Sequence, residues 1–109
     1  MKFNIINNHI LVTVETDLGN KQCVFDTGSP FTFFFNNVSE YSIDGRTFKV
    51  FPNPMTSMLA RYRPKIEEMI GVTIDGFIGT DNIKNSNVVI NFPNRELNIS
   101  VNEGCFGVN

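Results

Sequence analysis

Hydrophobic and polar residues alternate over the first half of the chain in the pattern of half-buried strands. Residues 9–17 (HILVTVETD) alternate and are rich in β-branched side chains, which predicts a strand. Residues 18–20 predict a turn, and residues 21–26 (KQCVFD) predict the returning strand of a hairpin. Residues 31–35 (FTFFF) predict a short, fully apolar strand, and residues 41–51 predict a second hairpin.

The spacing of apolar residues becomes helical after residue 54. Residues 55–70 carry apolar side chains at intervals of three and four, and Pro64 predicts a break between two helical turns. In the second turn we expect Ile66, Met69 and Ile70 to face inward, and Gly71 to end the helix.

The remaining residues return to a strand pattern. Residues 72–79 predict a strand, and residues 80–85 predict a single helical turn capped by Thr80 or Asp81. A last hairpin is expected, formed by residues 88–92 and 96–101. Residues 1–109 are therefore expected to form one mostly β domain with a closed or sandwich-like sheet and one or two short helices.

Composition narrows the classes of function. Hydrophobic residues make up 41 % of the chain, which is enough to bury a core. The formal charge is −2 without a basic cluster, so nucleic acid is not an expected partner. No apolar run approaches the roughly 20 residues that span a bilayer, and the first ten residues lack the core of a secretory signal. We expect no membrane contact by this chain, which would be cytoplasmic or a fragment of a larger protein.

Cysteine and histidine usage limits the chemistry further. Cys23 and Cys105 are far apart in the sequence, which is compatible either with two inert thiols or with one disulfide between them. No Cys or His has metal-ligand spacing, and neither a metal nor a cofactor is expected. His9, the only histidine, lies in a strand-like run, so neither a metal site nor a Ser-His triad is expected there.

One short stretch stands out because it places a charge where an apolar run ends. In CVFDTGSPF (23–31), Asp26 follows an apolar strand and precedes a turn that leads into more apolar residues. An unpaired carboxylate removed from water costs several kcal/mol or takes up a proton. Asp26 therefore needs a partner or has a chemical use.

A second stretch, DGFIG (75–79), carries two bulky apolar residues followed by glycine about fifty residues downstream. The pair VFDTGS and DGFIG resembles the signature of aspartic proteases of the retropepsin and pepsin type. The continuation GTDNIKNSNVVINFPNREL (79–97) looks like the closing segment of single-domain members, so the resemblance spans about residues 10 to 100. It implies a closed β-barrel of the acid protease fold.

The resemblance also implies a mechanism and site residues. Such enzymes use two carboxylates that share one proton and one water, and this chain has a single Asp-Thr-Gly. A symmetric homodimer would supply the second copy of the catalytic Asp26. By resemblance, Thr27 would join the two loops, Gly28 would permit the tight turn, and the Ser29 hydroxyl would orient the carboxylate. The signature residues would form an apolar floor under the loop: Phe77, Ile78 and Gly79.

The resemblance also implies a β-hairpin flap that covers the substrate. The hairpin at 41–51 is the only candidate in the right order, with Asp44 and Gly45 at its turn and Tyr41 or Phe48 facing the substrate. An ordinary surface hairpin is the alternative. The C-terminal residues 98–109 could pair with a second chain or form a tail.

The other acidic residues have simpler interpretations. Asp75 is expected in a turn, with a second catalytic carboxylate in the same chain as the alternative. Asp81 is expected to cap a helical turn rather than to serve a site.

Taken with the resemblance, the sequence predicts an aspartic peptidase that acts on peptides or proteins as a homodimer. The alternative is a protease-fold module that binds peptides or assembles without turnover.

Overall fold

The computed structural model describes residues 1–52 and 54–101 and contains a curled half-barrel sheet with two helices. Strands make up 43 % and helices 14 % of the chain, which confirms the prediction of a mostly β domain with short helices. The elements in chain order are β1 Asn4–Ile6, β2 His9–Thr16, β3 Gly19–Phe25, β4 Phe33–Phe34, β5 Glu40–Ile43, β6 Arg46–Lys49, α1 Thr56–Arg61, α2 Arg63–Ile70, β7 Gly76–Ile78, β8 Ser86–Asn91 and β9 Glu96–Val101.

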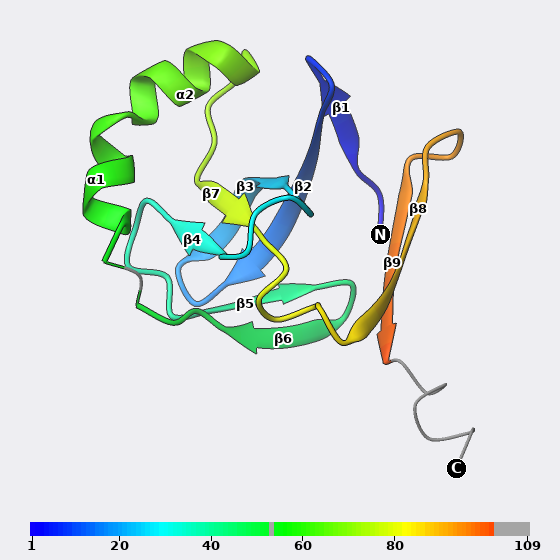
Figure 1. Cartoon of the computed structure of the whole chain (residues 1–109). Coiled ribbons are helices and arrows are strands. Elements are labelled where there is room, and N and C mark those ends of the chain that lie inside the picture. Colours follow the sequence, from blue (N-terminus) through cyan, green and yellow to red (C-terminus); the bar gives the residue numbers. More distant parts are fainter. Residues whose placement is uncertain (53, 102–109) are drawn as a thin grey trace.

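The main sheet has the strand order β4-β7-β3-β2-β5-β6, and β1 also pairs with β2 (Figure 1). All of these pairs are antiparallel except β3 with β7, which is parallel. A parallel neighbour needs a crossover, and the segment with α1 and α2 lies on the crossover path. The closed barrel stays a prediction, because the described strands form a half-barrel.

Two apolar clusters lie on opposite faces of β2 and β3. Val12, Val14 and Cys23 belong to the main core, where they pack with side chains of the two C-terminal hairpin strands. Leu11 and Val24 belong to a second cluster that the end of α2 covers. The division follows from the two-residue period of a strand, which sends successive side chains to opposite faces.

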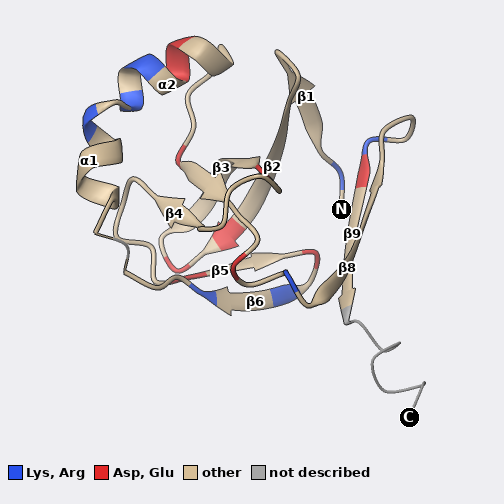
Figure 2. Ribbon diagram, in the orientation of Figure 1, with Lys and Arg blue, Asp and Glu red and all other residues tan. Residues whose placement is uncertain are grey.

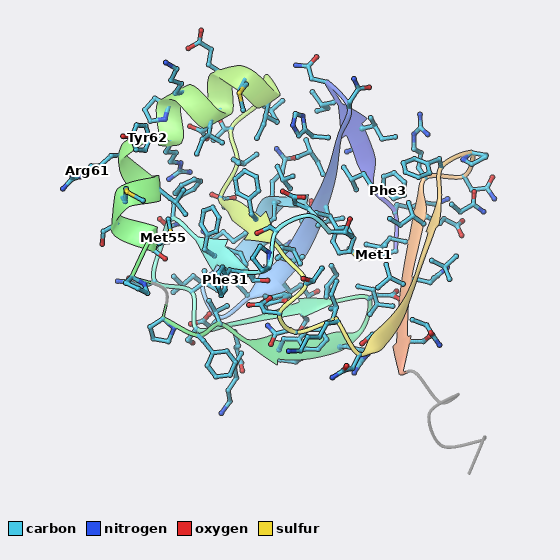
Figure 3. All side chains as sticks on the ribbon, viewed as in Figure 1. Met1, Phe3, Phe31, Met55, Arg61 and Tyr62 are labelled. Carbon is cyan, nitrogen blue, oxygen red and sulfur yellow. The ribbon has the colours of Figure 1, made fainter. Side chains whose placement is uncertain are left out.

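Helix α2 ends as predicted, but the helical segment buries fewer side chains than its spacing indicates. Gly71 adopts φ +97° at the end of α2, and Ile70 is buried. The prediction that Met69 faces inward is wrong, since its side chain is 69 % exposed. Helix α1 buries no residue at all; it lies beside the edge strand β4, and Arg61 and Tyr62 project outward at its end (Figures 1 and 3).

Three predicted segments form less regular structure than their patterns indicate. The apolar run 31–35 forms only the two-residue strand β4, and Phe31 is 54 % exposed. The strand predicted at 72–79 is reduced to β7. Residues 80–85 form turns instead of a helical turn. In these segments side chains accept some of the backbone N–H groups: Asp81 accepts those of Thr32 and Asn82, and Glu67 accepts that of Ile74.

The hairpin of β8 and β9 pairs with the N-terminal residues. The Phe3 N–H donates to the Arg95 carbonyl at 3.0 Å, and the Leu97 N–H donates to the Met1 carbonyl at 2.8 Å. Leu97 and Ile99 point into the main core. Residues 98–101, the first part of the C-terminal stretch, belong to β9. The prediction that this stretch pairs with a second chain or forms a tail falls, for residues 102–109, outside the described residues. Within the described ranges, no helix has both the length and the apolar character needed to cross a bilayer.

Candidate functional site

Asp26 begins the loop that follows β3, and its side chain is half-buried. The Gly28 N–H donates to Asp26 Oδ1 at 2.9 Å, and a Cβ at Gly28 would lie 3.2 Å from the same oxygen. The Asp26 N–H donates to the Ile78 carbonyl at 2.9 Å. The Gly28 amide thus satisfies one carboxylate oxygen, and the half-exposed position makes the carboxylate less costly than full burial would.

Ser29 does not orient the carboxylate within one chain. Its hydroxyl donates to the Phe31 carbonyl at 2.8 Å, so the predicted bond to Asp26 is not made. The Ser29 carbonyl instead accepts the Thr80 N–H at 2.9 Å. Thr27 is exposed at the tip of the loop, and its predicted contact across a two-fold axis stays a prediction. The local geometry of the loop therefore depends on backbone contacts to the residues after β7.

The two stretches of the signature are adjacent in space because β3 and β7 pair in parallel. The register joins Val24 to Phe77 and Phe25 to Ile78. Ile78 is fully buried, and the half-buried Phe77 ring stacks on Phe33 with centroids 5.1 Å apart. Both side chains pack as apolar residues beside the end of β3, and their predicted role as a floor under the loop stays a prediction.

Gly79 occupies a space that no larger residue fits. A Cβ at this position would lie 2.3 Å from the Phe31 carbonyl oxygen and 2.6 Å from the Ser29 carbonyl oxygen. Both atoms belong to backbone, so a side chain could enter only if the two loops moved apart. The loop after β7 therefore crosses the loop after β3 closely at Gly79.

Thr32 and Asp81 join these loops through side chains. Asp81 Oδ2 accepts the Thr32 N–H at 3.0 Å, and Oδ1 accepts the Thr32 hydroxyl at 2.7 Å. The Gly79 N–H in turn donates to Thr32 Oγ1 at 2.9 Å. This role was not predicted from the sequence, since Asp81 was expected to cap a helical turn. Its local contact to the Asn82 N–H, at 3.1 Å, is only one of its three.

A cavity of about 280 Å³ lies at the end of β3, and Asp26 is one of the residues that line it. Its lining residues are Asn8, His9, Ile10, Val24, Phe25, Asp26 and Thr27. The pairing of β2 with β3 ends at Leu11 and Val24, and His9 and Asp26 each lie two residues beyond that pair, where both line this cavity. The Nδ1 atom of His9 is buried and has no hydrogen-bond partner within the described residues. No role was predicted for His9. The turn was expected at residues 18–20, whereas the observed register joins Thr16 to Gly19.

The candidate flap is present as the hairpin of β5 and β6, but its turn is tied down. Asp44 Oδ2 accepts the Ile99 N–H, and its Oδ1 lies 3.3 Å from the Met1 amino group. Gly45 has φ +77°, as the predicted turn requires. The Arg46 guanidinium donates to Ser86 Oγ at 2.9 Å. The hairpin is thus attached to β8 and β9 at its closed end.

The aromatic residues of this hairpin are less available than predicted. Tyr41 is 1 % exposed and packs against Phe34 in the main core, so the expectation that it faces a substrate is wrong. Burial raises the pKa of the Tyr41 hydroxyl, which accepts a hydrogen bond from Asn82 at 3.3 Å. Phe48 is half-buried, with its ring 5.6 Å from Tyr41 and 5.2 Å from the Arg46 guanidinium. Its predicted substrate contact stays a prediction.

The remaining candidate groups have structural partners. Asp75 Oδ2 accepts the Gln22 N–H at 2.9 Å, and Oδ1 lies 3.6 Å from Arg63, so Asp75 serves to attach β7 and α2 to β3. Cys23 is fully buried, and desolvation raises the pKa of its thiol far above the usual range. Cys105 lies outside the described residues. Among the described side chains, no group of three or more His, Cys, Asp and Glu is arranged to hold a metal ion.

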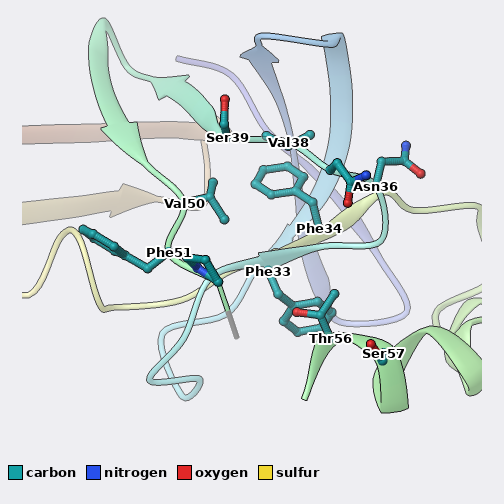
Figure 4. Close-up of a pocket in the computed structure, with 11 residues that line it drawn as sticks. Phe33, Phe34, Asn36, Val38, Ser39, Val50, Phe51, Thr56 and Ser57 are labelled. Carbon is teal, nitrogen blue, oxygen red and sulfur yellow. The ribbon is translucent and has the colours of Figure 1, made fainter. Parts of the chain in front are cut away.

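A second cavity, of about 390 Å³, lies between β4 and the start of α1 (Figure 4). Phe33, Phe34, Val38 and Phe51 give it apolar walls, and no charged residue lines it. It is suited to an uncharged group but holds no titratable side chain. Figure 2 shows Lys and Arg on the helices, on β6 and next to β9, and none on the loop that carries Asp26.

No protein-family model matches the chain, and no curated protein or solved structure matches it either.

Proposed function

We propose that the chain is an aspartic endopeptidase of the retropepsin-like type that cleaves peptides or proteins as a homodimer. In this proposal Asp26 of each chain contributes one carboxylate to a site on the two-fold axis. The curled sheet is then part of the closed barrel of that family. The proposal needs no metal and no cofactor.

The parallel pairing of β3 with β7 carries this proposal. It aligns the strand that ends at Asp26 with the strand that leads into Gly79, in the register Phe25 to Ile78. Backbone bonds between the two loops then hold the Asp26 main chain, while the Gly28 N–H holds Oδ1. A carboxylate oriented by its neighbours and half-exposed at a loop is accessible to a second copy.

The chemistry follows from bringing two such carboxylates within about 3 Å of each other, where they share one proton. The ionised member takes a proton from a bound water, and the protonated member donates to the carbonyl oxygen of the scissile bond. Because the two groups titrate jointly, the acid–base behaviour belongs to the pair and not to either copy of Asp26.

One observation favours the second candidate, a protease-fold module that binds peptides without turnover. The hairpin of β5 and β6 is attached at its turn through Asp44 to Ile99 and through Arg46 to Ser86. A lid must move to admit and then enclose a substrate, and these contacts oppose that motion. Peptide binding in an open groove does not require the hairpin to close.

Cleavage of a mixed peptide library between pH 4 and 7 separates the two candidates. The peptidase proposal expects products from the wild-type chain and at least about a hundredfold less product from Asp26→Asn, which removes the general acid and base. Equal cleavage by both proteins would show that another protein or residue is responsible. Sedimentation at the assay concentration gives a second criterion, because a strict monomer contains only one Asp26 and cannot form the pair.

A further inference from the structure

Asp81 binds three donors at the point where the loop after β7 crosses the loop after β3. Its carboxylate accepts the N–H and the hydroxyl of Thr32 and the N–H of Asn82, at distances of 3.0, 2.7 and 3.1 Å. Thr32 is 3 % exposed, and it is the one buried polar residue of the described chain. A buried hydroxyl that has an ionised acceptor is held more firmly than one that bonds a neutral group.

The carboxylate determines the direction of the hydrogen bonds in this cluster. An ionised Asp81 can only accept, so the single hydroxyl proton of Thr32 points toward it. The lone pairs of Thr32 Oγ1 are then free to accept the Gly79 N–H at 2.9 Å. An amide at position 81 could present its NH₂ group to Thr32, and that arrangement would not fix the hydroxyl proton.

The cluster lies beside the bonds that hold the main chain of Asp26. The Thr80 N–H donates to the Ser29 carbonyl at 2.9 Å, and the Asp26 N–H donates to the Ile78 carbonyl at the same distance. Gly79 sits between these two bonds along the chain. Any shift of Gly79 relative to Thr32 therefore changes the position from which the Asp26 side chain leaves the backbone.

We propose that Asp81 is a positioning residue for Asp26, acting through the hydroxyl of Thr32 and the N–H of Gly79. This inference rests on the proposed peptidase function and adds to it a residue that does not touch the substrate. A displacement of about 1 Å at a reacting group is enough to slow a reaction roughly a hundredfold. Loss of the carboxylate should therefore lower kcat more than it raises KM.

The chain contains a chemically matched control for this cluster. Asp17 also accepts three donors, the N–H and the hydroxyl of Ser39 and the N–H of Glu40, at 2.9, 2.8 and 3.2 Å. It joins the turn between β2 and β3 to the residues at the start of β5, and it contacts neither loop of the candidate site. Asp17→Asn removes the same kind of cluster from another part of the fold.

The test compares Asp81→Asn and Thr32→Val with Thr32→Ser and Asp17→Asn in the full chain. We expect kcat to fall at least about tenfold in the first two variants, with KM within about twofold of wild type. Thr32→Ser keeps the hydroxyl and should retain kcat within about threefold, and Asp17→Asn should retain kcat while its urea midpoint falls. Equal loss of kcat in Asp81→Asn and Asp17→Asn would overturn the inference, because both changes would then act through stability alone.

Amide hydrogen exchange measures the same positioning without turnover. In Asp81→Asn the Gly79 and Gly28 amides should exchange at least about tenfold faster than in wild type, and in Asp17→Asn they should not. Unchanged exchange at both amides would overturn the inference even if the protein is an active peptidase. A wild-type chain that cleaves nothing would instead refute the proposed function, and faster exchange would still show that Asp81 holds the loop. If Asp81→Asn does not fold, the comparison of Thr32→Val with Thr32→Ser decides the result by the same measurements.

Discussion

Replacing Gly79 by alanine adds a methyl group where backbone already lies. The added Cβ would be 2.3 Å from the Phe31 carbonyl oxygen and 2.6 Å from both the Phe31 carbonyl carbon and the Ser29 carbonyl oxygen. Cβ atoms essentially never approach other atoms closer than 3.0 Å, so the loops must separate by several tenths of an ångström or more. None of these contacts is with the end of a flexible side chain that could turn away.

The cost of that movement is large relative to the stability of a domain of this size. Overpacking in a well-packed core costs about 1–3 kcal/mol and sometimes more, and here three backbone atoms resist. Separation of the loops also weakens the bonds from the Gly79 N–H to Thr32 and from the Thr80 N–H to the Ser29 carbonyl. We therefore expect Gly79→Ala to lower the free energy of unfolding by about 3 kcal/mol or more, out of a total of roughly 5–15 kcal/mol.

Urea unfolding followed by circular dichroism measures this loss. With a slope of about 1.5 kcal/mol per molar urea, the midpoint should fall by about 2 M. Gly45→Ala is the matched control, because Gly45 has φ +77° and no atom within 4 Å of an added Cβ. That variant carries only the cost of the left-handed backbone, about 1 kcal/mol, or about 0.7 M urea. If Gly79→Ala is no more destabilising than Gly45→Ala, the close crossing of the two loops is refuted.

Three further predictions concern other parts of the fold. In a Cys105→Ser variant, Cys23 should resist alkylation at pH 8 in the native protein and react after unfolding, because burial raises the pKa of its thiol. Rapid labelling of the native protein would contradict the burial of Cys23. The Ser39 hydroxyl lowers the pKa of Asp17, so Asp17 stabilises the fold above its unfolded value of 3.8, and that contribution is lost as the pH falls through the lower folded value. The gap between the urea midpoints of wild type and Asp17→Asn should therefore narrow below pH 3.8; a constant gap would contradict this linkage. Leu97→Ala should cost about 2–5 kcal/mol by urea unfolding, since Leu97 is fully buried where β9 meets the main core, and a loss below about 1 kcal/mol would refute that packing.

Local sequence patterns predicted the hairpins because each of them depends on residues that are close in the chain. The alternation in residues 9–17 led to β2 and the adjacent turn led to β3, and the Asp44-Gly45 pair led to the turn between β5 and β6. Gly71 ended the second helix for the same reason, since only glycine adopts φ +97° readily. In all these cases the deciding interaction spans only a few residues.

Burial was harder to predict where it depends on what lies opposite a side chain. Met69 has the spacing of an inward-facing residue, yet the short helix presents it to solvent. Phe31 belongs to an apolar run, but the loop carries it outward before β4 begins. Tyr41 belongs to a hairpin that was predicted to face a substrate, and it is nevertheless buried in the core. Periodicity states which residues share a face, and it does not state whether anything covers that face.

The sequence alone was sufficient to single out Asp26 and Gly79, because a charge after an apolar strand and a glycine after two bulky residues are unusual in themselves. The partners of these residues required the folded chain. Asp81 meets Thr32 across 49 positions, and His9 comes to line the same cavity as Asp26, only because strands distant in sequence take a particular register. Contacts of that kind depend on the balance of packing over the whole sheet, which no short stretch of residues contains.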